Sequence, residues 1–142
     1  MTNAFNKDAE MHMGEGKKCG PPGYDNGEFI TKWGLESESE SYTVYYNDEI
    51  IGAFILWIAD DNNNFLGNIF IDPKYDSKGI GTSVWKLIEN KYQDTKKWTT
   101  ETPGFSRRNH SFYVNKCGFK IVKIEAAYDF FEANYIMEKE MK

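Results

Sequence analysis

Hydrophobic and polar residues alternate along much of the chain after Ser41, and this period of two predicts a sheet. The runs are rich in β-branched and aromatic residues and are separated by turn residues. We expect strands at 41–47, 49–59, 65–72, 97–102, 119–128 and 131–141. The first three are joined by short turns and should form an antiparallel meander, with the long apolar second strand in a central position.

Apolar residues at spacings of three and four predict helices in the remaining segments. Helices are expected at 1–13, around 29–33, from Ile80 to about Gln93, and at 106–116, the last ending at Gly118. The order is therefore α-α-β-β-β-α-β-α-β-β. It predicts the α/β (α+β) fold class, with a mixed, mostly antiparallel central sheet, helices on both faces and one helical crossover. The 142 residues suit a single domain over 1–142, of which 1–24 is an atypical or shortened N-terminal part.

The composition narrows the classes of partner. A formal net charge of −5 argues against nucleic acid. No apolar run approaches the roughly 18 residues of a membrane-spanning helix, and the first residues do not read as a secretory signal. Cys19 and Cys117 read as two reduced thiols, which points to the cytoplasm. His12 and His110 lack the spacing of a metal site, so no metal is expected.

A glycine-rich turn stands between a predicted strand and a predicted helix. The strand ends at Asp72-Pro73, and the helix opens with Gly79-Ile80-Gly81-Thr82. A helix N-terminus has free backbone N–H groups, and glycine lets the backbone approach an anion closely. A P-loop would need lysine directly after the second glycine, and a dinucleotide fingerprint would need glycine at Val84. Taken alone, the glycines would be explained by a tight strand-to-helix turn.

A second motif changes that interpretation. Residues 109–119 read Asn-His-Ser-Phe-Tyr-Val-Asn-Lys-Cys-Gly-Phe. Together with the strand, the glycine turn and the helix before it, this motif resembles the GCN5-related N-acetyltransferases over roughly residues 25–141. The resemblance implies an acyl-CoA N-acyltransferase-like fold. It also implies transfer of the acetyl group of acetyl-coenzyme A, as co-substrate, to a primary amine, without a metal.

The resemblance assigns cofactor-binding roles residue by residue. In the family, the fourth strand carries a bulge and splays from the fifth, and the pantetheine arm lies in the resulting slot. The strand residues that would bind that arm are Ile69, Phe70 and Ile71. The pyrophosphate would lie on the loop residues Lys78, Gly79, Ile80, Gly81 and Thr82. Asn109 would reach the pantetheine arm, and Phe112 and Lys116 would border the far side of the cofactor.

Three features depart from the family pattern. Asp76 stands three residues before the first glycine, where the family has Gln or Arg, and places an anion beside the predicted pyrophosphate site. The family's tyrosine position is Val114, while the tyrosine is Tyr113, about 100° round a regular helix. The predicted order also lacks the strand with which the family begins. Either the chain is shortened or a partner covers the sheet edge, and an uncovered edge would favour a homodimer.

The chemistry requires a base for the amine and an acid for the leaving thiolate. Glu101, at the end of the strand beside the splay, is the candidate base; its alternative is a surface or capping acid. Asp60 and Asp61 rank lower because they lie in a turn. Tyr113 is the candidate acid, with packing beside Phe112 as its alternative. Cys117 is not favoured as a nucleophile, because it precedes a helix-ending glycine and has no His-Asp pair near it in sequence.

The sequence thus predicts a cytoplasmic N-acetyltransferase in which a primary amine of a small molecule or peptide attacks acetyl-coenzyme A directly, assisted by a general base. Neither nucleic acid nor a membrane is expected as a partner. Two alternatives remain open at this point. One is a non-catalytic acyl-coenzyme A-binding module or sensor on the same fold, and the other is a shortened, inactive chain.

Overall fold

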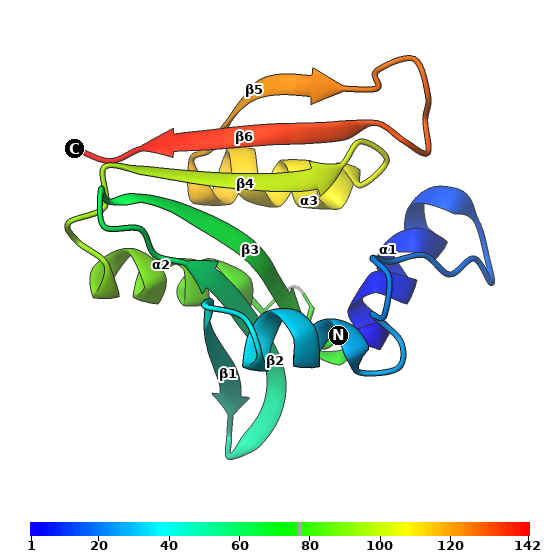
Figure 1. The fold of residues 1–142 in the computed structure, drawn as a ribbon. Coiled ribbons are helices and arrows are strands. Elements are labelled where there is room, and N and C mark those ends of the chain that lie inside the picture. The colour runs from blue at the N-terminus through cyan, green and yellow to red at the C-terminus, as the bar shows by residue number, and fades with distance from the viewer. Residues whose placement is uncertain (77) are drawn as a thin grey trace.

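The computed structural model describes residues 1–76 and 78–142; Ser77, within the predicted glycine loop, lies outside the described residues. The elements are α1 (Thr2–Met13), η1 (Ile30–Leu35), β1 (Glu40–Tyr46), β2 (Glu49–Trp57), β3 (Asn63–Ile71), η2 (Pro73–Tyr75), α2 (Ile80–Lys91), β4 (Lys97–Pro103), α3 (Arg107–Ser111), η3 (Phe112–Cys117), β5 (Lys120–Glu125) and β6 (Asn134–Glu140) (Figure 1). The predicted order is confirmed. The elements η1 and η3 are π-helical, and η2 is a 3₁₀ turn.

The strands form one six-stranded sheet in the order β1-β2-β3-β4-β6-β5. Of these strands, only β3 and β4 pair in parallel, across the crossover made by α2. The last two strands are shorter than the predicted 119–128 and 131–141. Ala126 has φ of 49°, and the Asp129 carboxylate accepts the backbone N–H groups of Phe131 and Glu132. These contacts favour a turn in place of the strand ends.

Helices cover both faces of the sheet, as predicted. On one face, Trp85 of α2 packs against Trp98 of β4 and against Phe119, with ring centroids 5.4 and 5.2 Å apart. On the other face, η1 lies over β2, because a Cβ on Gly34 would lie 3.7 Å from Ile55 Cδ1. The larger core is therefore the aromatic layer under α2 and η3.

The parallel pair β3–β4 separates along its length. Its ladder runs from Asn63↔Lys97 to Leu66↔Thr100 and then stops, while each strand continues beside its other neighbour, β2 or β6. The separation coincides with a bulge in β3. Ile55 faces Asn68 and Leu56 faces Leu66, which leaves Gly67 without a partner on β2. Both strand features implied by the family resemblance are present.

The helix α1 lies at the end of the sheet where β3 and β4 point apart (Figure 1). Ser106, just after β4, donates a hydrogen bond from its buried hydroxyl to Asp8 at 2.9 Å. Phe5 packs edge-on against Tyr24, whose hydroxyl donates to Asn6. The N-terminal residues thus form a helix docked at this end, and β1 is one edge of the sheet.

Candidate functional site

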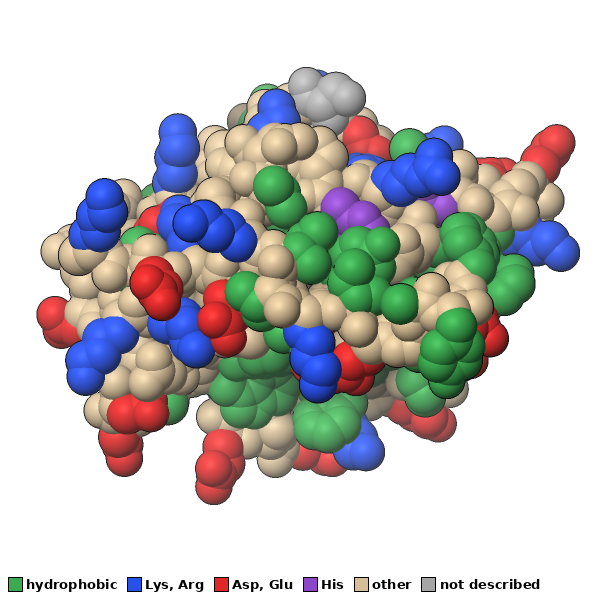
Figure 2. Space-filling model, turned by 90° about the horizontal axis from the view of Figure 1, so that it is seen from above, with side chains coloured by type: hydrophobic (Ala, Val, Ile, Leu, Met, Phe, Trp, Pro, Cys, Tyr) green, Lys and Arg blue, Asp and Glu red, His purple; other side chains and the backbone are tan. Residues whose placement is uncertain are grey.

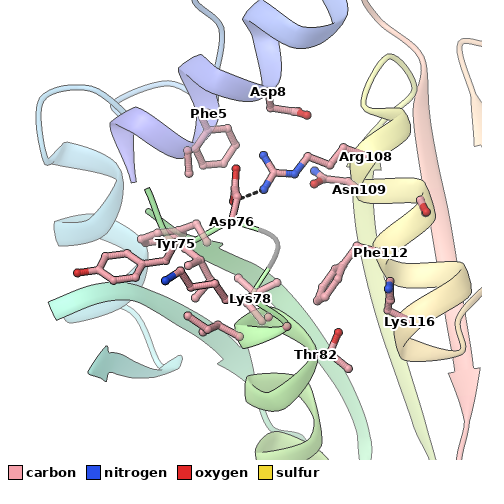
Figure 3. Close-up of a pocket in the computed structure, with 18 residues that line it drawn as sticks. Phe5, Asp8, Tyr75, Asp76, Lys78, Thr82, Arg108, Asn109, Phe112 and Lys116 are labelled. Carbon is pink, nitrogen blue, oxygen red and sulfur yellow. Dashed lines mark hydrogen bonds and ion pairs between the residues drawn. The ribbon is translucent and has the colours of Figure 1, made fainter. Parts of the chain in front are cut away.

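A pocket of about 520 Å³ opens where β3 and β4 separate (Figure 3). Its walls come from the end of β3, the loop before α2, the start of α2, the outer side of α3 and η3, and α1. The lining residues are Ala4, Phe5, Asp8, Ile69, Phe70, Ile71, Tyr75, Asp76, Lys78, Gly79, Ile80, Gly81, Thr82, Arg108, Asn109, Ser111, Phe112 and Lys116.

Every residue that the sequence assigned to cofactor binding lines this pocket. The three β3 residues form one wall, the loop and first helical residues 78–82 form the floor, and Asn109, Phe112 and Lys116 form the opposite wall. Three separate segments of sequence therefore meet at one place. The walls are apolar along β3 and at Phe112, and cations stand near the loop, an arrangement that suits an extended molecule with an apolar arm and an anionic end.

The start of α2 offers unsatisfied backbone donors to the pocket. Gly79 is the N-cap, in the left-handed region with φ of 71°, and among the described residues no side chain caps the helix. The backbone N–H of Ser83 bonds to the carbonyl of Gly79, so the amides before it are free of intrahelical partners. These amides carry the positive end of the helix dipole, and an anion is favoured there.

The two glycines serve different purposes. At Gly79 a Cβ would meet nothing within 4 Å, so the requirement is the left-handed backbone. At Gly81 a Cβ would lie 3.1 Å from Phe112 Cε2, so the requirement is close packing of α2 against η3. Gly81 therefore brings the two motifs together and fixes the width of the pocket.

The wall on α3 is anchored to β4. Ser106 caps α3, and its side chain accepts from the Asn109 backbone N–H at 3.4 Å. The Asn109 side-chain amide donates to the Thr102 hydroxyl at 3.1 Å, which leaves the Asn109 side-chain oxygen available toward the pocket. The position of Asn109 is thus set by two hydrogen bonds on the far side of the splay from β3.

Charges of both signs line the pocket. The Arg108 guanidinium pairs with the Asp76 carboxylate across the pocket (Figure 3). Asp8 is nearly buried; it accepts from Ser106 and lies 3.4 Å from His12 Nε2. Asp76, the anion that the glycine motif places near the predicted pyrophosphate site, is therefore partnered by the cation of Arg108, the residue just before the second motif.

Tyr113 does not line the pocket; its side chain is buried in the core. The ring packs at 5.7 Å from that of Phe119, and the hydroxyl lies beside the Thr100 side chain. Thr100 is paired with Leu66 at the last rung of the β3–β4 ladder, so the hydroxyl lies near the apex of the splay. Burial raises the pKa of Tyr113. Val114, at the family's tyrosine position, is exposed.

Glu101 is also outside the pocket lining. It lies on β4 between the buried Thr100 and Thr102, and therefore points to the opposite face of the sheet, where it is exposed. Its carboxylate accepts from the Asn134 side chain at 3.2 Å. The structure brings together the predicted cofactor-binding residues, but it places neither predicted catalytic residue on the same wall.

The other acids and the thiol lie elsewhere. Asp60 and Asp61 are in the β2–β3 turn, at the end of β3 remote from the splay, and hydrogen bonds from Asn63 lower the pKa of Asp61.

The Cys117 thiol also lies outside the pocket lining. Burial raises its pKa to about 12, which disfavours the thiolate form. Within the described residues, no group of three or more His, Cys, Asp or Glu side chains could hold a metal ion.

Seven lining residues had no predicted role in binding. They are Ala4, Phe5 and Asp8 of α1, Tyr75, Asp76, Arg108 and Ser111. Arg108 and Ser111 adjoin motif residues in the sequence, so helical geometry could have suggested them. No local signal could place α1 here, because its docking depends on contacts with residues nearly a hundred positions away.

The chain belongs to the Acetyltransferase (GNAT) family, which matches over residues 9–119. Among curated proteins, the uncharacterized protein YrkN of Bacillus subtilis (strain 168) is 45% identical over 83 residues, which are 58% of this chain and 45% of that protein. The match thus spans less than half the length of that relative.

Solved acetyltransferase structures share the fold. A Bacillus subtilis acetyltransferase in complex with CoA aligns with TM-score 0.69 and 20% identity, covering 83% of this chain and 86% of that one. A GNAT family acetyltransferase from Elizabethkingia anophelis with acetyl-CoA bound aligns with TM-score 0.67 and 25% identity. The alignment covers 83% of this chain and 85% of that one. An acetyltransferase from Thermus thermophilus aligns with TM-score 0.74 and 10% identity, covering 99% and 86%.

Proposed function

We propose that this protein is an acetyl-coenzyme A-dependent N-acetyltransferase that acts on a primary amine of a small molecule or peptide. One observation carries the proposal. The eleven residues that two separate motifs assign to the cofactor line a single pocket at the point where β3 bulges and leaves β4. The two relatives described above with CoA or acetyl-CoA bound support the same ligand here.

The pocket explains how the cofactor would be held. Beyond Leu66, the edge of β3 that faces β4 has no strand partner among the described residues, so the backbone of Ile69 to Ile71 can bond to the amides of a pantetheine arm. The free amides at Gly79–Thr82 would receive the pyrophosphate. Phe112 would close the apolar side, and Lys78 and Lys116 would add positive charge.

The reaction joins the amine nitrogen to the thioester carbonyl carbon and breaks the carbon–sulfur bond. An amine with a pKa near 10.4 is neutral in about one molecule in a thousand at pH 7, so a base must accept a proton. Backbone N–H groups at the Gly67 bulge would stabilise the oxyanion. Tyr113, protonated because burial raises its pKa and close to the apex of the splay, would return a proton to the thiolate.

The identity of the base is part of the proposal. Glu101 projects from β4 beyond the last β3–β4 rung on the face opposite α2, so an acceptor approaching from that face would meet it. Its hydrogen bond from Asn134 leaves carboxylate lone pairs free. A Glu101→Gln variant should lose turnover at neutral pH and recover part of it at higher pH, where more of the acceptor amine is neutral.

A second function is favoured by one observation. Neither Glu101 nor Tyr113 lines the pocket, so the fold could retain acyl-coenzyme A binding without catalysis and act as a sensor. Thermal melting with and without acetyl-coenzyme A tests both functions, and no shift at saturating ligand would contradict both. A thiol-release assay over a panel of amines separates them, since the sensor binds without turnover.

Two further properties are proposed. Both cysteines are free, which suits the reducing cytoplasm proposed for the chain.

The sheet has β1 and β5 as its edges, and all six residues of β5 are exposed. A homodimer could therefore form by pairing of these edges. Light scattering would test this association.

No helix in the described part of the chain is long and apolar enough to cross a membrane.

A further inference from the structure

Arg108 places a cation next to the glycine motif, which lacks the cation or amide expected at Asp76. The residue three positions before Gly79 is Asp76, where the resemblance implies Gln or Arg. In the folded chain, Arg108 of α3 reaches across the pocket, and its terminal guanidinium nitrogen pairs with the Asp76 carboxylate (Figure 3). A cation from the residue just before the second motif therefore stands where the first motif would have supplied one.

The Arg108–Asp76 pair is only partly buried. On the face of the molecule that Figure 2 shows, Lys and Arg side chains stand among Asp, Glu and hydrophobic side chains. The Arg108 side chain is 36% exposed and that of Asp76 is 27% exposed. Both residues line the pocket together with the free amides of the α2 N-terminus. A guanidinium has five N–H donors in a planar fork, and it binds phosphate oxygens as readily as it binds a carboxylate. One carboxylate does not use all of these donors.

The neighbouring charges do not compete for Arg108. Asp8, the other carboxylate of the pocket, already accepts from Ser106 and lies against His12. Lys78 and Lys116 also line the pocket, and among the described residues neither forms an ion pair with an acid. Arg108 is thus the pocket cation whose charge is cancelled by a carboxylate when no anion is bound.

We propose, on the basis of the proposed function, that Arg108 binds the pyrophosphate of coenzyme A. Its ion pair with Asp76 then breaks when the cofactor binds. Asp76 then lowers the affinity for coenzyme A, since it neutralises the guanidinium in the free protein and repels the phosphates in the complex. Binding becomes an exchange of one anion for another at the same cation.

Four proteins test this exchange: the wild type, Arg108→Gln, Asp76→Asn and the double variant. Titration calorimetry with coenzyme A should show about tenfold weaker binding for Arg108→Gln, since a charge-assisted hydrogen bond is lost. Asp76→Asn should bind about threefold more tightly, because a repulsive charge is removed. Arg108→Gln should cost more in the Asp76→Asn background than in the wild type, because the guanidinium is unpaired there.

Two controls make the result specific. Arg107→Gln removes the same charge from the neighbouring residue of α3, which is exposed and does not line the pocket, and should leave affinity within about twofold of the wild type. Dephospho-coenzyme A keeps the pyrophosphate but lacks the 3′-phosphate, and should report the same loss for Arg108→Gln. Circular dichroism and thermal melting establish that each variant is folded.

The outcomes are distinguishable. Unchanged affinity of Arg108→Gln, or a loss that disappears with dephospho-coenzyme A, would overturn the pyrophosphate assignment. Weaker binding by Asp76→Asn would overturn the exchange, because Asp76 would then only position Arg108. If the wild type itself does not bind coenzyme A, the proposed function fails, which is a different result from wild-type binding that Arg108→Gln leaves intact.

Discussion

Gly67→Ala is expected to destabilise the protein at the point where β3 bulges and leaves β4. A Cβ at this position would lie 2.2 Å from Cζ3 and 3.0 Å from Cε3 of Trp57, and 3.2 Å from the carbonyl oxygen of Ile55. Carbon atoms in good contact are about 3.5–4.0 Å apart, so the Trp57 ring would have to move by roughly 1.3 Å or more.

The ring is not free to move. Trp57 packs edge-on against Trp33 and Phe65, with centroids 6.3 and 6.0 Å away. Overpacking of this kind costs about 1–3 kcal/mol. We expect a loss near 2 kcal/mol in the free energy of unfolding, which corresponds to a fall in melting temperature of about 4–8 °C.

A double-mutant cycle with Trp57→Leu isolates the clash. In that background, Gly67→Ala should cost less than about 0.5 kcal/mol, which gives a coupling of more than about 1 kcal/mol. Urea unfolding followed by circular dichroism supplies the free energies, and coenzyme A titration of the folded variants shows whether the pocket is retained. Gly34→Ala is the matched control, since a Cβ there would make ordinary contacts at 3.7 Å.

One result would refute this reasoning. If Gly67→Ala costs as much in the Trp57→Leu background as in the wild type, contact with the indole is not the reason that glycine is needed at the bulge. An equal loss of stability for Gly34→Ala would also refute the clash, because that site has room for the added carbon.

Three other changes have definite expected outcomes. Gly79→Ala should lose about 1–2 kcal/mol of stability in urea unfolding, because φ of 71° strains any residue with a Cβ, and Gly79→Asn should lose less. Gly81→Trp should abolish coenzyme A binding in calorimetry, since an indole would displace Phe112 and fill the pocket; retained affinity would mean that the phosphates bind elsewhere. Burial lowers the pKa of His110, so the unfolded state binds more protons as pH falls through about 6.5. Unfolding free energy should therefore rise with pH between about 5 and 7, and His110→Gln should flatten that slope.

The fold was largely predictable because its signals are local. The alternation of residues 41–72 and the helical spacing of 80–93 each reflect which side chains face a core. Strand ends in 119–141 were less predictable, since the turn depends on Ala126 and on the Asp129 side chain accepting backbone amides. The π-helical turn at Phe112–Cys117 also had no sequence signal, although it decides that Tyr113 faces the core and Val114 the solvent.

That the eleven residues assigned to the cofactor would lie at one place was predictable, because they belong to two short motifs. The remaining side was not, because long-range contacts assemble it. Asp8 is held at the pocket by its hydrogen bond with Ser106, and Arg108 is held opposite the glycine motif by its pairing with Asp76. Sequence reasoning identified Asp76 as the residue that fits a phosphate site least. Only the fold shows which cation stands opposite it.

The most direct test of the central claim is a turnover assay. The purified chain is incubated with acetyl-coenzyme A and a panel of small-molecule and peptide amines, and both thiol release and the acetylated amine are measured. We predict stoichiometric appearance of free coenzyme A and acetylated product with at least one amine, and loss of turnover with retained coenzyme A binding in Tyr113→Phe. Tight binding of acetyl-coenzyme A with no product from any amine would contradict the enzyme and favour the sensor.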